Sequence, residues 1–164
     1  MTEQSVVLLL GSNDIEAQDI VRRAIDIVGL SVGKVEKISQ GFRSEAYGFT
    51  SEREFVNQAI EISTTHDAYE VLRRINLIEA LLGRDREEEC RVKAEREERY
   101  ASRPIDIDII FYGDMTFDDS RLTIPYHFLD EREYALRPVA DIAGERRHPM
   151  LAKTPRQMLE ALKK

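Results

Sequence analysis

Two aspartates, Asp106 and Asp108, lie two positions apart in the otherwise apolar segment 105–112. The β-branched composition of this segment predicts a strand. Alternate side chains of a strand share a face, so both carboxylates should leave the same face, roughly 6 to 7 Å apart. Such a pair repels without a counter-charge, and its hard oxygen ligands suit Mg²⁺ better than zinc, which prefers histidine and thiolate. Taken alone, the pair also fits the exposed polar face of an ordinary strand.

Arginines flank this strand in the sequence. Arg103 stands shortly before it, and Arg84 and Arg86 follow Gly83 at the end of a predicted helix. Phosphoryl transfer depends mainly on positioning and charge neutralisation, with metals bridging phosphate oxygens and guanidinium groups binding them bidentately. On their own, Arg84 and Arg86 are explained as cations at a helix C terminus. Together with the aspartate pair, the arginines indicate a phosphate-binding site.

A third candidate is Asn57, which shares a face of the predicted strand 55–62 with Phe55. An amide can read the donor and acceptor edge of a heterocycle while an aromatic ring covers its face, although an asparagine in a strand is more often structural. The Gly-Ser-Asn segment 11–13 is interpreted as a turn, and it lacks the spacing of a P-loop. The sequence contains no Walker or Rossmann fingerprint and does not indicate covalent nucleophilic catalysis.

The elements that must position these residues follow from hydrophobic periodicity. Strands are predicted at 5–11, 34–42, 55–62 and 105–112, with helices at 15–30 and 67–82. The order β-α-β-β-α-β is that of a ferredoxin-like α+β sandwich, in which two helices cover one face of an antiparallel sheet. We expect Asn13 or Asp14 to cap the first helix and Asp67 the second. Three C-terminal additions are predicted: a short strand at 122–125, one or two irregular helices within 127–140, and a helix that starts at Thr154-Pro155 and runs to Leu162.

Composition limits the function classes. A chain of 164 residues with 42% hydrophobic and 34% charged residues fits one globular domain spanning 1–164. The net charge of −7 argues against binding to nucleic acid or to an anionic membrane. A single cysteine, Cys90, excludes an internal disulfide. The N terminus lacks the basic start of a signal peptide, and no apolar stretch is long enough to span a bilayer, so we expect a cytoplasmic protein.

Taken together, these residues resemble the hydroxymethyl-dihydropterin pyrophosphokinase (HPPK) family. The matching segments occur in family order, cover most of the chain, and are 8–13, 55–57, 83–84, 102–112 and 132–138. The arginine followed by the Asp-x-Asp strand is the most specific of them. The combination is much more specific than any one segment.

The resemblance implies a reaction and its cofactor. Pyrophosphate is transferred from Mg-ATP to 6-hydroxymethyl-7,8-dihydropterin in folate biosynthesis: the hydroxymethyl oxygen attacks the β-phosphorus and AMP leaves. ATP would bring two Mg²⁺ ions, held by Asp106 and Asp108, while Arg84 and Arg103 would act as catalytic cations that neutralise the triphosphate. The resemblance also implies a monomer.

The resemblance further assigns residues to the two substrates. Asn57 would read the pterin edge, Phe55 and Tyr134 would flank its ring, and Ser44 and Tyr47 would contact it from the loop after Phe42. Around the nucleotide the resemblance places Glu79, Ile109, Thr123, Arg132 and either Tyr126 or His127. The family usually has Pro-His where this chain has Pro125-Tyr126-His127, so which of the two side chains meets the phosphates is open.

Two other functions are compatible with parts of the pattern. The paired aspartates also occur in ferredoxin-like metal-dependent nucleases and nucleotidyl transferases, but the acidic net charge and the missing basic face oppose that interpretation. A catalytically silent ligand-binding domain would account for the tyrosine at position 126. Turnover, as opposed to binding alone, separates these possibilities.

Overall fold

A continuously apolar segment near the N terminus forms the centre of the sheet. The computed structural model describes residues 2–44, 55–83 and 104–163. Strand β1 (Gln4–Ser12) pairs antiparallel with β4 (Phe55–Thr64) on one side and with β5 (Asp106–Tyr112) on the other. Because β1 is covered on both faces, its apolar residues run continuously instead of alternating with polar ones.

The predicted strand 34–42 is two separate strands. β2 (Lys34–Ile38) and β3 (Phe42–Ser44) both pair antiparallel with β4, and the strand order β2-β4-β1-β5 is that of the predicted ferredoxin-like sandwich. The break falls at Ser39, whose hydroxyl accepts the backbone N–H of Ala59 at 2.9 Å. A side chain here takes the place of a ladder carbonyl, so the pairing is interrupted and resumes at Phe42.

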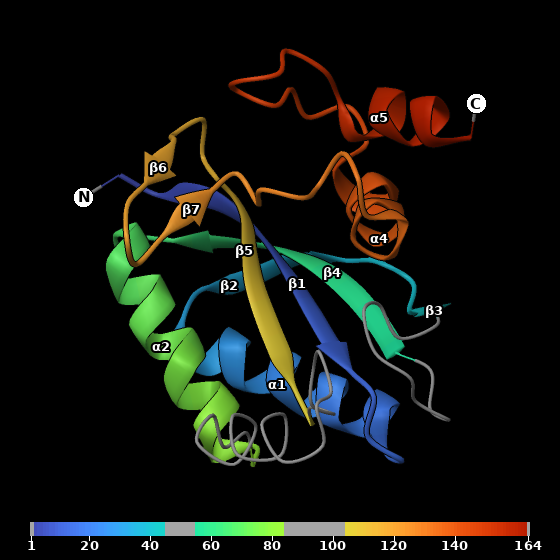
Figure 1. Cartoon of the computed structure of the whole chain (residues 1–164). Coiled ribbons are helices and arrows are strands. Elements are labelled where there is room, and N and C mark those ends of the chain that lie inside the picture. The colour runs from blue at the N-terminus through green and yellow to red at the C-terminus, as the bar shows by residue number, and fades with distance from the viewer. Residues whose placement is uncertain (1, 45–54, 84–103, 164) are drawn as a thin grey trace.

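Two amphipathic helices, α1 (Ala17–Ser31) and α2 (Ala68–Leu81), cover one face of the sheet, as predicted (Figure 1). Asp67 caps α2 by accepting the backbone N–H of Glu70 at 2.8 Å. The predicted cap of α1 is wrong, because that helix begins two residues later and has no side-chain cap. The Asp14 carboxylate instead accepts the backbone N–H of Glu16 in the preceding turn. Among the described residues, no helix has the length and apolar character needed to cross a membrane.

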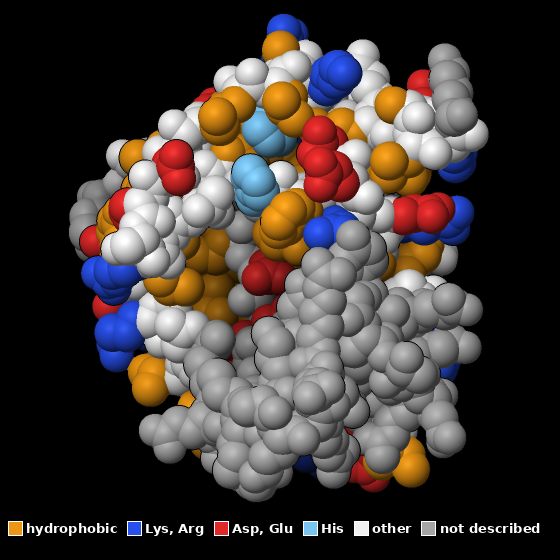
Figure 2. All heavy atoms as spheres, viewed as in Figure 1, with side chains coloured by type: hydrophobic (Ala, Val, Ile, Leu, Met, Phe, Trp, Pro, Cys, Tyr) orange, Lys and Arg blue, Asp and Glu red, His pale blue; other side chains and the backbone are white. Residues whose placement is uncertain are grey.

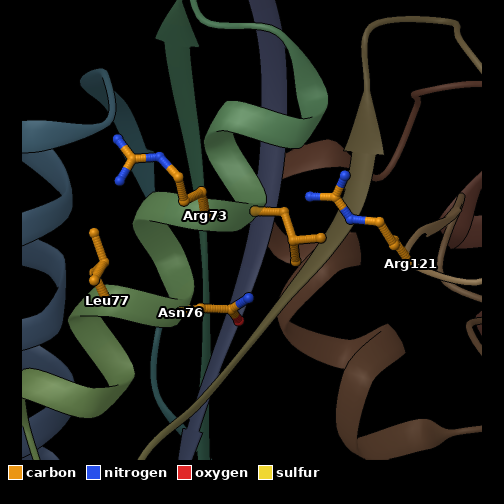
Figure 3. A pocket seen from close by; sticks show the side chains of 5 residues that line it. Arg73, Asn76, Leu77 and Arg121 are labelled. Atoms are coloured by element: carbon orange, nitrogen blue, oxygen red, sulfur yellow. The ribbon is translucent and has the colours of Figure 1, made fainter.

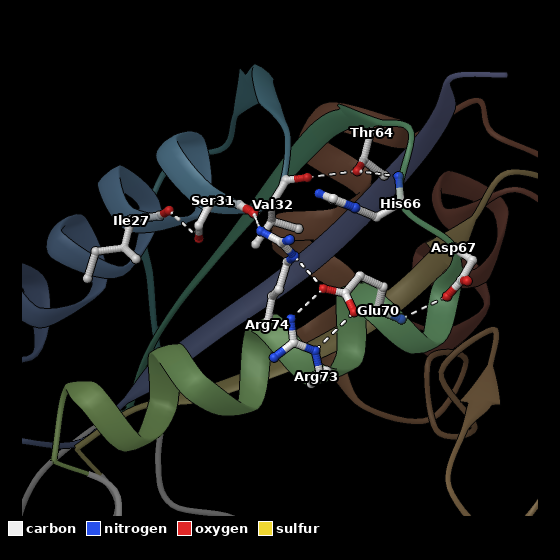
Figure 4. A network of polar contacts seen from close by, with 9 residues as sticks. All are labelled: Ile27, Ser31, Val32, Thr64, His66, Asp67, Glu70, Arg73 and Arg74. Atoms are coloured by element: carbon white, nitrogen blue, oxygen red, sulfur yellow. Dashed lines mark hydrogen bonds and ion pairs between the residues drawn. The ribbon is translucent and has the colours of Figure 1, made fainter. Parts of the chain in front are cut away.

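A polar network joins the end of α1 to α2 and β4 (Figure 4). The Arg74 guanidinium donates to the carbonyl of Ser31 at 2.6 Å and to the Glu70 carboxylate at 2.7 Å. The Thr64 hydroxyl donates to the carbonyl of Val32 at 2.7 Å. Carbonyls at the end of α1 are thereby satisfied by side chains from its neighbours, which fixes the two helices beside one another.

The C-terminal third of the chain covers part of the opposite face. Helix α4 (Glu133–Ala143) packs on that face and α5 (Pro155–Leu162) lies next to it, while β6 (Phe117–Asp118) and β7 (Thr123–Ile124) form a short hairpin (Figure 1). Thr154 and Gln157 cap α5 reciprocally, and Pro155 is its first residue, so the predicted start is confirmed. The sheet therefore has a core on each face.

His148, between α4 and α5, gives the fold a pH-dependent contact. Its Nδ1 accepts the backbone N–H groups of Met150 and Leu151, both at 3.1 Å, and burial lowers the pKa of the imidazole from its ordinary value of 6.5. The unfolded chain therefore binds a proton at His148 more readily than the folded protein does. The stabilisation that neutral His148 gives to the fold is complete above about pH 6.5, and it is lost as the pH falls through the pKa of His148 in the folded protein.

We therefore expect the free energy of unfolding to decrease, relative to that of His148→Asn, as the pH is lowered from about 7.5 to 5. The asparagine carbonyl offers an acceptor near the position of Nδ1 but does not titrate. Urea titrations of both proteins across this range measure the effect. Parallel pH profiles for the two proteins would show that His148 does not titrate in this way.

Candidate functional site

One row of paired residues crosses three strands at the end of the sheet. Gly11 of β1 is the register partner of Asn57 on β4 and also of Asp106 on β5. Two residues earlier on β1, Leu9 is the register partner of Asp108 on β5. Register partners in an antiparallel sheet share a face, so the amide and both carboxylates lie on the same side of the sheet.

Burial along β5 identifies which side this is. Ile107 and Ile109 are buried in the core between the sheet and helices α1 and α2, whereas Asp106 and Asp108 are partly exposed on the opposite face. Helix α4 packs on that face against β1, β3 and β4 (Figure 1). Figure 2 shows a recess on the molecular surface in this view, in which acidic and hydrophobic side chains are visible.

The absence of a side chain at Gly11 makes room for the Asn57 amide. A Cβ atom at this position would lie 2.5 Å from Oδ1 of Asn57, closer than van der Waals contact allows. The sequence predicts a turn at 11–13, but Gly11 and Ser12 belong to β1, so that interpretation is corrected. The role of Gly11 as the residue between two polar side chains depends on the strand register, which the local sequence does not reveal.

Tyr126 and Tyr134 pack against the core between the sheet and α4, near Asp106 and Asp108. The backbone N–H of Tyr126 donates to the carbonyl of Ile110 on β5 at 3.1 Å, and its hydroxyl lies 3.1 Å from that of Tyr134 on α4. Burial, with the nearby Asp108 carboxylate, raises the pKa of Tyr126 well above its usual range, and burial likewise raises that of Tyr134. Both phenols therefore remain protonated at neutral pH.

The edge of the sheet next to Asn57 carries further polar and aromatic groups. On β3, Phe42 pairs with Asn57 and Ser44 pairs with Phe55. Within the part of the chain that the structure describes, the buried Ser44 hydroxyl has no hydrogen-bond partner. An unsatisfied buried hydroxyl costs about 1–3 kcal/mol, so a ligand that bonds to it would be favoured.

Two of the predicted nucleotide residues lie on the helix side of β5. Glu79 of α2 is 2% exposed, and its carboxylate accepts the backbone N–H of Ile107 at 2.8 Å, which fixes the start of β5 to the helix. The Ile109 side chain lies in the core between the sheet and the helices. Neither side chain shares the face of Asp106 and Asp108.

The other predicted nucleotide residues lie in or after the β6-β7 hairpin. Thr123 is exposed on β7, and the exposed His127 ring lies 4.7 Å from that of Phe128. Arg132, at the start of α4, places its guanidinium over the same Phe128 ring, 4.6 Å from the ring centroid. The predicted residues Tyr47, Arg84 and Arg103 lie outside the described residues.

A separate hollow of about 420 Å³ lies on the outer side of α2 (Figure 3). It is lined by Leu72, Arg73, Asn76, Leu77 and Arg121, none of which is a predicted site residue. Arg73 is paired with Glu70, and Arg121 lies over the ring of Tyr69. Both cations already have partners, so the hollow is a weaker candidate for phosphate chemistry than the face that carries Asp106 and Asp108.

The fold and the polar residues on one face of its sheet indicate a class of enzyme. A ferredoxin-like sandwich with two carboxylates, an amide and tyrosines on the open part of its sheet is suited to metal-dependent phosphoryl transfer. The family model of 7,8-dihydro-6-hydroxymethylpterin-pyrophosphokinase (HPPK) matches residues 7–144, and the chain belongs to this family. The protein is accordingly a pyrophosphokinase of folate biosynthesis that acts on ATP and hydroxymethyldihydropterin.

Individual relatives agree with the family. The chain is 32% identical over 155 residues to a 2-amino-4-hydroxy-6-hydroxymethyldihydropteridine pyrophosphokinase of Synechocystis, covering 94% of this chain and 74% of the relative. It is 32% identical over 137 residues to the enzyme of that name from Methylorubrum extorquens, covering 83% of this chain and 80% of the relative.

Solved structures show the same fold. A crystal structure of an HPPK-DHPS protein in complex with substrates matches with a TM-score of 0.73 at 14% identity, covering 98% of this chain and 44% of that one. A Plasmodium falciparum HPPK-DHPS structure matches with a TM-score of 0.72 at 16% identity, covering 98% and 43%. This chain therefore spans less than half of those longer proteins, and the likeness concerns the fold.

Proposed function

We propose that the transfer takes place on the open part of the sheet, with Mg-ATP bound at Asp106 and Asp108 and the pterin bound at Asn57. The observation that carries this proposal is the register of Gly11 with both Asn57 and Asp106, which sets the two proposed subsites side by side. We also propose a monomeric enzyme, from the sequence resemblance.

The carboxylate pair fits magnesium that arrives with a nucleotide. Asp106 and Asp108 offer hard oxygen ligands from one strand face, and both are partly exposed. Mg²⁺ is typically held by one or two carboxylates together with substrate phosphates, so we propose that the pair holds two ions. When bound, the ions would neutralise the phosphate oxygens and polarise the β-phosphorus.

The pterin side is supported by the arrangement of β3 and β4. Asn57 is 5% exposed, so hydrogen bonds that it makes to a heterocycle are largely shielded from water. Phe55 and Tyr134 would provide the aromatic surfaces, and the Ser44 hydroxyl would gain a partner. Tyr47 is also proposed for this subsite, from the sequence resemblance alone.

On the nucleotide side, the geometry favours Tyr126 over His127 as the phosphate contact. Tyr126 is partly buried beside the carboxylate pair, whereas His127 is exposed against Phe128. Arg132 would provide a cation at the start of α4, and Thr123 a polar contact from β7. Arg84 and Arg103 are proposed as the catalytic cations from the sequence resemblance.

Glu79 and Ile109 would act on the nucleotide through the backbone of β5, since their side chains lie on the other face of the sheet. Glu79 fixes the strand that carries the carboxylates, and the peptide groups at Ile109 would be the part of that residue accessible to a ligand. Their proposed role is therefore to set the position of Asp106 and Asp108.

The proposed reaction is attack of the pterin hydroxymethyl oxygen on the β-phosphorus of ATP. The bond from the β-phosphorus to the oxygen of AMP breaks, and the pyrophosphoryl group is transferred intact. The residues of the chain would hold the two substrates in line, shield the phosphates from water and supply hydrogen bonds to the transferred group.

The test is the identity of the nucleotide product. Incubation with Mg-ATP and 6-hydroxymethyl-7,8-dihydropterin should release AMP in step with pterin pyrophosphate, and omission of either pterin or Mg²⁺ should abolish the release. Release of ADP would indicate another phosphotransferase. Tight pterin and nucleotide binding without turnover would indicate a catalytically silent domain.

Replacing Gly11 with alanine should impair pterin binding specifically. The added Cβ would meet Oδ1 of Asn57, and the Asn57 amide must rotate away because the strand backbone is held on both sides. We expect the KM for the pterin to rise about tenfold, the effect of one or two misplaced hydrogen bonds, while the free energy of unfolding changes little.

The matched control is Gly29→Ala on α1. A Cβ there makes only ordinary contact, with Val35 at 3.5 Å, and it lies on the other side of the sheet. Initial-rate kinetics with varied pterin should separate the two variants. If both raise the pterin KM equally, or neither does, the placement of the amide next to Gly11 does not govern pterin binding.

A further inference from the structure

The bond between the hydroxyls of Tyr126 and Tyr134 joins the two halves of the site. We propose that this bond is a positioning contact: Tyr134, which the proposed function assigns to the pterin subsite, orients the Tyr126 hydroxyl toward the ATP phosphates. The proposal rests on the proposed function for the assignment of the subsites. The new element is that a hydroxyl on the pterin side helps to determine nucleotide binding.

The two tyrosines are anchored on different elements. The Tyr126 backbone donates to the carbonyl of Ile110 on β5, two residues beyond Asp108, and its carbonyl accepts the backbone N–H of Leu129. Tyr134 lies in the first turn of α4, the helix that packs on the same face of the sheet. The 3.1 Å contact between the hydroxyls therefore connects the segment attached to β5 with α4.

The chemistry of the pair suits a phosphate oxygen. A phenol hydroxyl has one proton and can also accept, so when Tyr134 donates to Tyr126, the Tyr126 proton is directed to an acceptor outside the pair. Donation by Tyr134 also polarises the Tyr126 O–H and strengthens the bond that it makes. An anionic oxygen next to Tyr126 would select this arrangement over the reverse one.

The sequence supplies a reason for the pair. Position 126 carries tyrosine where the HPPK pattern usually has histidine, and an imidazole would be oriented by different partners. The O–H bond of a phenol at this position can turn about the C–O bond unless its hydroxyl is held by a partner. Tyr134 holds it, since the bond lies at the border of the α4 core, where both rings are packed.

The test is a double-mutant cycle with Tyr126→Phe, Tyr134→Phe and the double variant. Each substitution removes one hydroxyl and keeps the ring. We expect Tyr134→Phe to raise the KM for ATP about fivefold while kcat and unfolding temperature change by less than about twofold and about 2 °C. The double variant should be no worse than Tyr126→Phe alone, because both changes remove the same contact.

Independent effects would overturn the proposal. If the change in ATP KM for the double variant equals the product of the two single changes, or if Tyr134→Phe raises only the pterin KM, the hydroxyls do not act together. Tyr69→Phe is the matched control, because it removes an exposed hydroxyl that bonds to Asp119 and belongs to neither proposed subsite, and it should leave both KM values unchanged.

The same Tyr134→Phe substitution in a Tyr126→His protein separates the hydroxyl contact from changes in packing. In a Tyr126→His protein, Tyr134→Phe should have no further effect on the KM for ATP; a persistent fivefold rise would contradict the coupling. Failure of the proposed function is distinguishable, since it would appear as wild-type turnover in Asp106→Asn, a result that does not depend on the tyrosines.

Discussion

Asparagine at position 106 or 108 is expected to lower kcat by about a thousandfold or more. The substitution keeps the size and polarity of the side chain but removes the charge that would hold Mg²⁺ at the transferred phosphoryl group. Stabilisation of phosphate charge by metal ions is worth several kcal/mol, and about 4 kcal/mol corresponds to a thousandfold in rate. Initial rates of AMP release at saturating pterin and Mg-ATP measure the effect.

Both variants should remain folded, because Asp106 and Asp108 lie on the open face and not in either core. Asp26→Asn is the control, since it removes one exposed carboxylate from α1 on the opposite face and should leave kcat unchanged. Near-normal turnover in Asp106→Asn and Asp108→Asn would show that the catalytic metals are held elsewhere.

Alanine at position 57 is expected to raise the KM for the pterin about a hundredfold. Asn57 is almost completely buried, so the polar edge of a heterocycle at this place would be left without partners after the substitution. Unpaired groups in a shielded site cost about 1–3 kcal/mol each, and two of them account for the expected factor. The KM for ATP should change by less than about threefold, because the proposed nucleotide subsite is at Asp106 and Asp108.

Asn76→Ala provides the comparison for Asn57→Ala. It removes an exposed amide from the hollow on the outer side of α2 and should leave both KM values at their wild-type level. Equal effects of the two substitutions, or a rise in the ATP KM as large as that in the pterin KM, would remove Asn57 from the pterin subsite.

Much of the fold could be predicted from the sequence because its elements have clear periods and boundaries. The apolar segment that forms β1 and the capped, amphipathic α2 are examples, and their order gave the ferredoxin-like sandwich. The division of 34–42 into β2 and β3 was not predictable, because it depends on a bond between Ser39 and Ala59, twenty positions apart.

The site was predictable to a different extent for each residue. The shared face of Asp106 and Asp108 follows directly from the two-residue period of a strand. The pairing of Gly11 with Asn57 and the bond between two tyrosine hydroxyls depend on tertiary register, and local patterns carry no information on either. For the same reason the sequence left Tyr126 and His127 as alternatives; the greater burial of Tyr126 is the ground on which we propose it as the phosphate contact.

The most direct measurement is the number of Mn²⁺ ions bound per chain in the presence of saturating pterin and α,β-methylene-ATP, in which the bond to be broken is replaced. Electron paramagnetic resonance of free Mn²⁺ gives this number for the wild type and for Asp106→Asn. We predict two ions per wild-type chain and at most one, bound more weakly, in the variant. Two tightly bound ions in Asp106→Asn would contradict the assignment of the metal site to the Asp106 and Asp108 pair.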